Sequence, residues 1–367
     1  MTGTTGTTGT AGTTGTAGLR EIISGSVTVS VASDGDRAAW DAFVLSRPEA
    51  VGYHEWAWRG IFERAFGHEC IYLMARSGPT APVAGVLPLV LIKSFLFGKT
   101  LTSLPFVNFG GVLAESDDVA RHLVDEGARL AGGHGASHLE LRHIERRFAD
   151  WPCKQHKVTM RLPLETGMWE RIDRKARNQV RKAEKSGLAA VRGGEELLTE
   201  FYTVFARNMR DLGTPVYDRR LFAEVLRTFP DRAHLIVVRL GAVPVAAGFT
   251  FRTRGMIEIP WASSIRDFNN LCPNHLLYWR AIETAVVEGC EVFDFGRSTP
   301  GEGTFKFKEQ WNAQPVPLHW EYWLRGGGAL PDQSPKNPKF RLAIESWRRL
   351  PLWLANAVGP HIVSRIP

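Results

Sequence analysis

The order of apolar and polar positions repeats along the chain. Trp58–Phe66 has apolar residues at helical spacing and leads into two strand-like runs, Cys70–Arg76 and Val83–Ser94, with a turn between them. The same order begins again at Leu221–Phe229, which is followed by three strand-like runs within residues 235–264. Each half then supplies another step from helix to strand, at 117–144 and at 274–296. The pattern therefore predicts two copies of one α/β unit.

The spacing between the two copies exceeds that of solenoid repeats, so duplicated domains are the better interpretation. Hairpin-like strand pairs next to helices indicate mixed sheets covered by helices. Regularity breaks near Trp151–Pro163, which predicts the domain boundary there. We expect an N-terminal domain at 26–155, a C-terminal domain at 156–325, a disordered Gly/Thr tail at 1–25 and a basic amphipathic extension at 326–367.

A strongly basic helix is predicted between Met168 and Gly187. An apolar stripe at helical spacing fixes its inner face, and most of its seven bases, against three acids, lie elsewhere on its surface. A solvated charged face with i,i+4 pairs is one interpretation. The alternative is a bound polyanion, gripped by arginine forks that suit phosphate. The candidates for this role are Lys175, Arg177 and Arg181.

The stretch FDFGRSTPGEGTFKFKEQW, from Phe293 to Trp311, places two lysines beside aromatic residues after a Gly/Pro-rich loop. A partly desolvated ammonium group can stabilise an oxyanion or hold a phosphate. Lys306 and Lys308 are both candidates, and they would share one face if the segment were a strand. An exposed edge strand protected by lysines is the structural alternative.

Other candidates occur at the ends of predicted strands and helices. Glu258 lies on a predicted strand and would be a general base if it were buried near an amine acceptor. Arg297 follows the strand that contains Asp294, and the two form either part of a site or a structural ion pair. Candidates for an acceptor pocket are Tyr217, Asn274 and Tyr278, although Tyr278 also suits a helix core.

Composition narrows the choice of partners. The formal charge of +7 favours an anionic ligand or surface. The four cysteines are widely spaced, and the 11 histidines form no cluster with metal-ligand spacing, so we predict neither a metal nor a covalent nucleophile. The N-terminus lacks signal-peptide features and no apolar run is long enough to span a bilayer, which predicts a cytoplasmic protein. The segment 336–367 mixes bulky apolar residues with bases, and it suits either a membrane surface or packing across the domains.

Two motifs resemble those of the FemAB-type transferases. That family carries an F-K-x-x-[FW]-G segment and a K-x-R-x-x-[VI]-[RK]-x-A-x-x-x-G helix, and Phe307–Trp311 and Lys175–Gly187 match them. Asn312 stands where the family has glycine. The chain is also similar to the FemAB-like proteins associated with exosortase/PEP-CTERM systems and exopolysaccharide gene clusters, in the segments 104–114, 208–222, 273–283 and 293–311. This likeness extends from about Tyr53 to Pro367.

The resemblance implies a tandem GNAT-like fold. It assigns to Lys308 the role of stabilising the acyl-transfer transition state, and to Arg177 contact with the substrate diphosphate. Acyl-CoA is one co-substrate that such a fold would use, although the [QR]-x-x-G-x-[GA] pyrophosphate turn is not found in this sequence. An aminoacyl-tRNA donor is the alternative.

Three hypotheses follow. The first is an acyltransferase that modifies a sugar- or nucleotide-linked precursor, including a lipid-linked glycan, in exopolysaccharide or cell-envelope assembly, at the inner face of the membrane. The second is an aminoacyl-tRNA-dependent transferase acting on a peptidoglycan precursor. The third is a non-catalytic accessory that binds an anionic polymer or a membrane.

Overall fold

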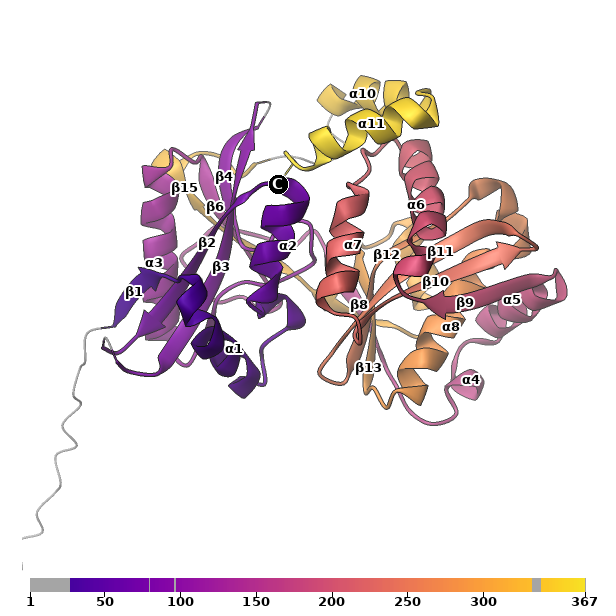
Figure 1. Ribbon diagram of the computed structural model, residues 1–367, viewed down its shortest axis with the longest axis horizontal. Helices are drawn as coiled ribbons and strands as arrows, with labels where there is room; N and C mark the ends of the chain where they lie inside the picture. Colours follow the sequence, from indigo (N-terminus) through magenta and orange to yellow (C-terminus); the bar gives the residue numbers. More distant parts are fainter. Residues whose placement is uncertain (1–26, 79, 96, 332–337, 367) are drawn as a thin grey trace, which may run out of the picture.

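The computed structural model describes residues 27–78, 80–95, 97–331 and 338–366, and it contains two α/β units side by side (Figure 1). The expected tail at 1–25 lies outside the described residues. Each unit is built on a mixed sheet with helices against its faces, which confirms the predicted fold class. The duplicated order of helices and strands in the sequence therefore corresponds to two separate sheets.

The first sheet has the strand order β1-β2-β3-β4-β6-β15-β7, with β5 beside β3. All neighbours are antiparallel except β4 and β6. Its strands are β1 (Thr28–Val31), β2 (Glu69–Arg76), β3 (Val83–Ser94), β4 (Gly98–Thr102), β5 (Leu113–Ala114), β6 (His138–His143), β7 (Cys153–Lys154) and β15 (His319–Leu324). Its helices are η1 (Asp34–Asp36), α1 (Arg37–Ser46), η2 (Gly52–His54), α2 (Ala57–Phe66) and α3 (Asp117–Gly133).

The second sheet has the order β14-β8-β13-β12-β11-β10-β9, and only β12 and β13 are parallel. Its strands are β8 (Val158–Pro163), β9 (Leu188–Gly193), β10 (Ala233–Leu240), β11 (Val243–Thr253), β12 (Met256–Ser264), β13 (Val292–Ser298) and β14 (Gln314–Pro317). Its helices are α4 (Met168–Arg171), α5 (Arg174–Lys185), η3 (Glu195–Leu197), α6 (Leu198–Leu212), α7 (Arg219–Thr228), η4 (Arg266–Leu271), α8 (Pro273–Val287) and α9 (Gly303–Glu309).

The chain passes from the first sheet to the second between β7 and β8, and it returns with β15. The expected C-terminal domain at 156–325 includes β15, but this strand pairs with β6 of the first sheet, with Tyr322 opposite Glu140. Sheet membership depends on hydrogen bonding between distant strands, which the local pattern of residues does not encode. The chain therefore crosses between the two units twice, first from β7 to β8 and then on its return to β15.

Apolar packing also continues across the interface. A single buried cluster contains Trp58 and Phe62 from α2 together with Phe222 from α7 and Phe249 from β11. Helix α2 lies against α7 where the two units meet (Figure 1). Burial of such large aromatic side chains contributes roughly 1.5–3 kcal/mol each, so the relative position of the two units is held by a true core.

The C-terminal helices α10 (Pro338–Arg348) and α11 (Leu352–Val363) follow η5 (Arg325–Gly327) and pack on α6. Gly359 of α11 lies against Val216, where an added Cβ would be 3.0 Å from the backbone nitrogen of Val216. The end of α11 reaches toward α2 of the first unit (Figure 1), beside His68. The sequence left two expectations for this segment, a membrane surface or packing across the domains. The buried side of α11 fits the second of them.

Candidate active site

The parallel strands β12 and β13 pair over three residues and then separate. Met256–Glu258 face Val292–Asp294, and beyond these pairs each strand continues without its neighbour. The pairing of β12 with β11 shifts register next to Pro260, which lacks the N–H that a regular ladder would need. The second sheet thus opens between β12 and β13, and three of the charged candidates, Glu258, Arg297 and Lys308, lie at this opening.

Glu258 lies at the last paired position of β12 and is 2% exposed. Its carboxylate accepts a hydrogen bond from the hydroxyl of Tyr53, at 2.7 Å, and another from the Nδ2 amide of Asn108. Both donors come from the first unit, so Glu258 is a contact across the domain interface. Its two oxygens are bound on the side of the first unit rather than facing solvent.

Asp294 lies opposite Glu258 on β13 and is fully buried. Its carboxylate accepts hydrogen bonds from Thr159 Oγ1, from Arg161 Nε at 3.1 Å and from the backbone N–H of Gly296 at 2.8 Å. The ion pair that the sequence offered between Asp294 and Arg297 is wrong, because Arg161 of β8 is the partner. Strand pairing places Arg161 directly opposite Asp294, whereas Arg297 lies beyond a bulge.

Lys308 is buried in α9, and its ammonium points at the backbone of β13. The Nζ donates to the carbonyl oxygen of Gly296 at 2.8 Å and to that of Arg297 at 3.1 Å. Segment 303–309 is a helix, so the interpretation as an edge strand is wrong. Two positions along a helix differ by about 200°, and Lys306 is accordingly exposed while Lys308 is 6% exposed. The structure brings Lys308 to the opening between the strands and leaves Lys306 on the surface.

The ionisable groups at this opening shift one another's pKa. Burial raises the pKa of Glu258 to about 8, and the nearby charge of Asp294 adds to the shift. Burial lowers the pKa of Lys308 to about 8, whereas the charges of Asp294 and Glu258 oppose that shift. With a pKa of about 8, Glu258 is largely protonated near neutral pH, so the charge of Asp294 is the main one that favours the buried ammonium there.

Gly296 makes the bulge at which the ammonium is held. Its φ is +72°, and an added Cβ would lie 3.1 Å from the carbonyl oxygen of Ile259 and 3.5 Å from Asn108 Nδ2. A side chain here would meet both the strand β12 and the loop from the first unit. Glycine is therefore required by conformation and by space.

Arg297 lies just past the bulge and reaches the surface between the two units. Its side chain is exposed, yet the protein that surrounds it and the charge of nearby Arg142 lower its pKa. Arg142 of β6 and Arg297 lie over the ring of Trp320, with 4.4 Å and 5.4 Å between guanidinium carbon and ring centroid. Tyr217 is near both arginines, and its ring lies 5.8 Å from that of Phe106. The structure thus brings Tyr217 and Arg297 together.

The basic helix lies elsewhere. It is broken at Ile172–Asp173 into α4 and α5, because Asp173 caps α5 by accepting a hydrogen bond from the backbone N–H of Lys175. Helix α5 packs on α8 and β9, on the side of the second unit away from the first (Figure 1). Arg181 lies over the ring of Trp169, and Arg177 is half-buried. Lys175, Arg177 and Arg181 are therefore not at the opening that holds Lys308.

Asn274 and Tyr278 belong to the start of α8. The Nδ2 of Asn274 donates to Ser264 Oγ at 2.9 Å, so this side chain ties the helix to the end of β12. Tyr278 is buried between the rings of Phe295 and Phe307, and burial raises its pKa. The hydroxyl-bearing ring therefore forms part of the core that supports α9.

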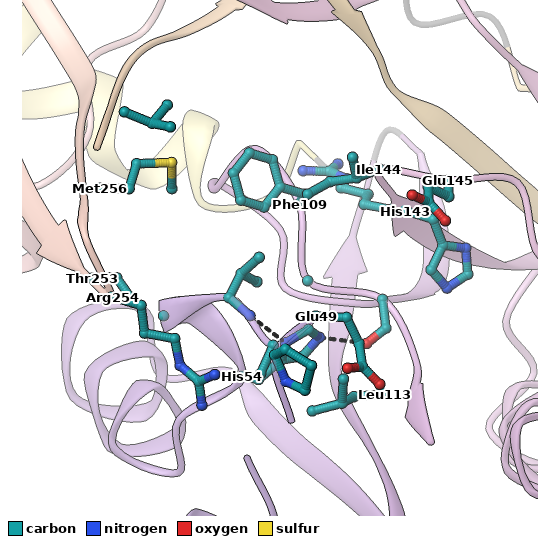
Figure 2. Close-up of a pocket in the computed structure, with 18 of the residues that line it drawn as sticks. Glu49, His54, Phe109, Leu113, His143, Ile144, Glu145, Thr253, Arg254 and Met256 are labelled. Atoms are coloured by element: carbon teal, nitrogen blue, oxygen red, sulfur yellow. Dashed lines mark hydrogen bonds between the residues drawn. The ribbon is translucent and has the colours of Figure 1, made fainter. Parts of the chain in front are cut away.

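A cavity of about 410 Å³ lies between the two units (Figure 2). His54 and His143 are buried in its wall, and burial lowers the pKa of His54 to about 4. His143 is held between the backbone N–H of Val112 and the carboxylate of Glu321. Arg161 lines this cavity and also bonds Asp294, whereas Lys308 does not line it.

Among the described residues, no helix is both long and apolar enough to cross a bilayer. Within the same residues, no group of three or more His, Cys, Asp or Glu side chains is placed to hold a metal ion. The four cysteines are free thiols.

Sequence reasoning missed several residues of the site, namely Tyr53, Asn108, Arg161, Arg142 and Trp320. Tyr53 and Glu258 are separated by 205 positions, so no local spacing connects them. The family resemblance did point to the segment LPFVNFGGVLA, which contains Asn108. Its position in the site depends on the packing of the two units.

Comparison with known families and structures agrees with this geometry. Residues 171–309 match the model of a family described as an acetyltransferase (GNAT) domain. The matched range includes both the basic helix α5 and the Lys308 helix α9. No curated protein sequence matches the chain.

Three solved structures are similar to this chain over most of its length. FemX is similar over 86% of this chain and 100% of its own, with a TM-score of 0.58 and 14% identity. A tandem GNAT protein from the clavulanic acid biosynthesis pathway is similar over 83% of this chain and 100% of its own (TM-score 0.53, 12% identity). The C-terminal domain of a putative lysylphosphatidylglycerol synthetase from Agrobacterium fabrum is similar over 78% of this chain and 92% of its own (TM-score 0.54, 12% identity). The chain has the tandem GNAT fold that its sequence predicted.

Proposed function

We propose that this protein is an acyl- or aminoacyltransferase that modifies an anionic, sugar- or nucleotide-linked precursor of exopolysaccharide or of the cell envelope. The observation that carries this proposal is the buried ammonium of Lys308, held at the opening between β12 and β13 within a GNAT domain. The exopolysaccharide setting is supported by the sequence resemblance alone.

The step requires stabilisation of a negative charge. When the acceptor attacks the acyl carbonyl, the electrons of the C=O π bond move onto oxygen. The leaving group departs as the carbonyl re-forms. Two N–H bonds of Lys308 point to the carbonyls of Gly296 and Arg297. An ammonium has three N–H bonds, so a third is left to donate to the developing oxyanion.

Glu258 acts in this proposal as a positioning residue. Both of its oxygens accept hydrogen bonds from the first unit, through Tyr53 and Asn108, so it does not point at an acceptor amine. Where Glu258 is ionised, at about pH 8 and above, its charge favours the protonated form of Lys308. The proton of the acceptor would pass to bound water or to the leaving group.

The start of α8 favours an aminoacyl ester over acyl-CoA as the donor. In a GNAT domain that uses CoA, backbone N–H groups at a helix N-terminus receive the pyrophosphate. Here the first helical residue is Pro273, which has no N–H, and the N–H of His275 donates to the carbonyl of Cys272. This observation supports the second hypothesis, an aminoacyl-tRNA-dependent transferase, within the same fold and site.

The C-terminal helices support work at an anionic membrane face. Trp353 of α11 is 71% exposed and Leu342 of α10 is 73% exposed. Arg341 and Arg348 are exposed on α10, and Arg349 is exposed just after its end. Exposed bulky apolar groups next to bases suit the interface of an anionic bilayer, which would bring a lipid-linked glycan close to the site.

The test is native mass spectrometry of gently purified protein followed by thermal-shift titration with acetyl-CoA, longer acyl-CoAs and UDP-sugars. Saturable stabilisation by an acyl-CoA would establish that donor class. Co-purifying tRNA that salt releases, with no response to any CoA, would establish the aminoacyl route. Binding that persists in Lys308→Met together with unchanged function in cells would show a non-catalytic accessory instead.

A further inference from the structure

The hairpin formed by β3 and β4 exposes a large apolar side chain at its end. Phe95 is 95% exposed, more than any other large apolar side chain among the described residues. Strand β3 pairs with β2 only as far as Leu91, opposite Glu69. It continues with β4 as far as Ser94, opposite Gly98, so the end of the hairpin extends beyond β2. A single exposed phenylalanine is common on protein surfaces, but Phe95 is distinguished by this projecting position.

Two lysines flank the end of the hairpin. Lys93 and Lys99 are directly opposite each other in the strand register, and both are exposed. Like charges in this position destabilise an antiparallel pair. Among the described side chains, Glu69 alone forms a salt bridge with either lysine, with 3.0 Å to Lys93 Nζ, while Lys99 Nζ donates to the backbone carbonyl of His134. The hairpin therefore keeps a net positive charge directly next to its apolar end.

The C-terminal helices present apolar groups on the same side of the molecule. The end of the β3–β4 hairpin and the helices α10 and α11 both reach the upper edge of the molecule in Figure 1, over the first and second units respectively. Ala355 and Gly359 are on the buried side of α11. Trp353 precedes Ala355 by two positions, which turns it by about 200° around the helix axis, and it is 71% exposed. Both units thus carry an outward apolar side chain toward one common side.

Basic residues accompany both apolar groups. Arg341 and Arg348 are exposed on α10, and Glu345 lies 3.7 Å from Arg341. On the first unit, Arg325 is exposed and lines a cavity of about 360 Å³ together with Phe97 of the hairpin. An anionic bilayer attracts bases to its surface, and its interfacial layer accepts single aromatic rings. The charge and the apolar groups on this side therefore match one partner.

A second copy of this chain fits the same side less well. In a symmetric pair the same patch of each copy would face the other, which would bring the bases of both copies together. The apolar groups are also single side chains on separate units rather than the contiguous patch that a stable protein interface buries. A fluid bilayer needs no such continuity, because each side chain enters it separately.

We infer that an anionic lipid membrane binds both units at once, through the Phe95 hairpin of the first unit and the α10–α11 pair of the second. This inference rests on the membrane contact in the proposed function and extends it to the first unit. Once one anchor is bound, the second binds as an intramolecular step. Two anchors on different units also fix the orientation of the protein on the bilayer.

The test measures vesicle binding by the full-length protein. Co-sedimentation uses vesicles of phosphatidylglycerol mixed with phosphatidylcholine, and vesicles of phosphatidylcholine alone. Phe95→Ser should weaken binding to the anionic vesicles by about 10-fold. Its melting temperature should stay unchanged, because a side chain that is 95% exposed loses no packing. Leu45→Ser is the matched control and should bind as the wild type does, since Leu45 is 71% exposed at the end of α1, in the lower part of Figure 1.

Lys99→Gln tests the charge of the hairpin. The loss of one base near the surface should weaken binding to anionic vesicles by about 5-fold and leave binding to neutral vesicles unchanged. The melting temperature should stay equal or rise, because the repulsion between Lys99 and Lys93 is removed. Lys185→Gln, at the exposed end of α5, is the control for a general loss of positive charge.

A double variant tests whether the two anchors act together. Phe95 and Trp353 belong to different units, so the fold-losses of Phe95→Ser and Trp353→Ser should multiply when the two changes are combined. If each anchor bound the bilayer in a separate orientation, either single variant would keep the other orientation. Most of the loss would then appear only in the double variant, and the inference that both units bind at once would be wrong.

Other outcomes also overturn the inference. They are wild-type binding in Phe95→Ser, an equal loss in Leu45→Ser, and an equal loss in Lys185→Gln and Lys99→Gln. A change in the oligomeric state of Phe95→Ser without lipid, with unchanged vesicle binding, would assign the hairpin to a contact between proteins. Loss of binding in Trp353→Ser alone would keep the C-terminal contact and reject the hairpin. A protein that binds vesicles through both anchors and transfers no group from any donor would keep this inference and reject the proposed enzyme.

Discussion

The Nζ of Lys308 lies 2.8 Å from the carbonyl oxygen of Gly296, at the bulge where β13 leaves β12. This contact fixes the buried ammonium on a backbone that can take its shape only with glycine, since the φ of Gly296 is +72°. The position of the charge is therefore set by the main chain rather than by a flexible loop. The predictions below depend on that arrangement.

Lys308→Met should abolish transfer while the protein stays folded. Removing one oxyanion donor in comparable enzymes lowers kcat by about 10²–10³-fold, and the two released carbonyls should lower the free energy of unfolding by about 1–3 kcal/mol. Transfer of a radiolabelled acyl or aminoacyl group and a denaturant titration measure the two effects. Lys306→Met, two residues away and exposed, is the matched control, and an equal loss of activity there would reject the assignment of Lys308.

Gly296→Ala should reduce both stability and activity. The left-handed conformation costs an alanine about 1–2 kcal/mol, and the added Cβ must also displace the backbone of Ile259, only 3.1 Å away. Gly301→Ala is a matched control, because its φ is +79° and nothing lies within 4 Å of its added Cβ. We expect Gly301→Ala to show only the conformational cost and to keep its activity. Equal effects in the two variants would show that the crowding at the bulge has no role.

Glu258→Gln should change how stability depends on pH. The folded-state pKa of Glu258 is about 8, above the ordinary value of 4.5, so its contribution to stability is fully present below pH 4.5 and is lost as the pH rises to about 8. The depressed pKa of Lys308 acts in a different window, where stability is lost as the pH falls from about 10.5 to about 8. Unfolding by urea between pH 4.5 and 8 should therefore give a flatter profile in Glu258→Gln. The same slope in both proteins would contradict the raised pKa.

Activity should decrease above about pH 8, because Lys308 loses its proton there. Glu258→Gln removes a negative charge that favours the ammonium, so the basic limb of its profile should move to lower pH. Lys308→Arg should keep a residual activity without this limb, since arginine stays protonated. Profiles of kcat/KM between pH 6 and 10 measure these effects, and a limb that stays in place in Lys308→Arg would belong to another group.

Trp353→Ser should weaken binding to anionic vesicles. Trp353 of α11 is 71% exposed and follows the bases at the end of α10, whereas Val287, 82% exposed at the end of α8, lies on another part of the second unit. Co-sedimentation with phosphatidylglycerol vesicles should therefore decrease in Trp353→Ser and not in Val287→Ser. Neutral phosphatidylcholine vesicles should bind less in every case. Equal binding to neutral and anionic vesicles would argue against this surface.

The sequence predicted the duplicated α/β architecture because each copy carries its own local pattern. Helical spacing at Trp58–Phe66 and Leu221–Phe229 and the alternating or apolar strand runs after them are properties of short segments. In the structure these two segments form the helices α2 and α7. Local chemistry is sufficient for such elements, because the burial of one face decides them.

The same reasoning failed at the segment with the two lysines. Phe305–Lys308 is too short for its spacing to separate a helix from a strand, and the helix α9 is decided by Trp311 and the packing of Phe307 on α8. Sheet membership of β15 was also beyond the local pattern, because its partner β6 lies far away in the sequence. Both differences arise where tertiary contacts outweigh local propensity.

The sequence by itself determined the two units, the basic helix and the identity of Lys308 as a candidate. Only the tertiary structure decided what surrounds that lysine. The link from Tyr53 to Glu258 spans 205 positions, and the stacking of Arg142 and Arg297 on Trp320 joins both units. Such contacts depend on how two sheets pack around a shared core, and that packing is a sum over many distant residues rather than a property of any one segment.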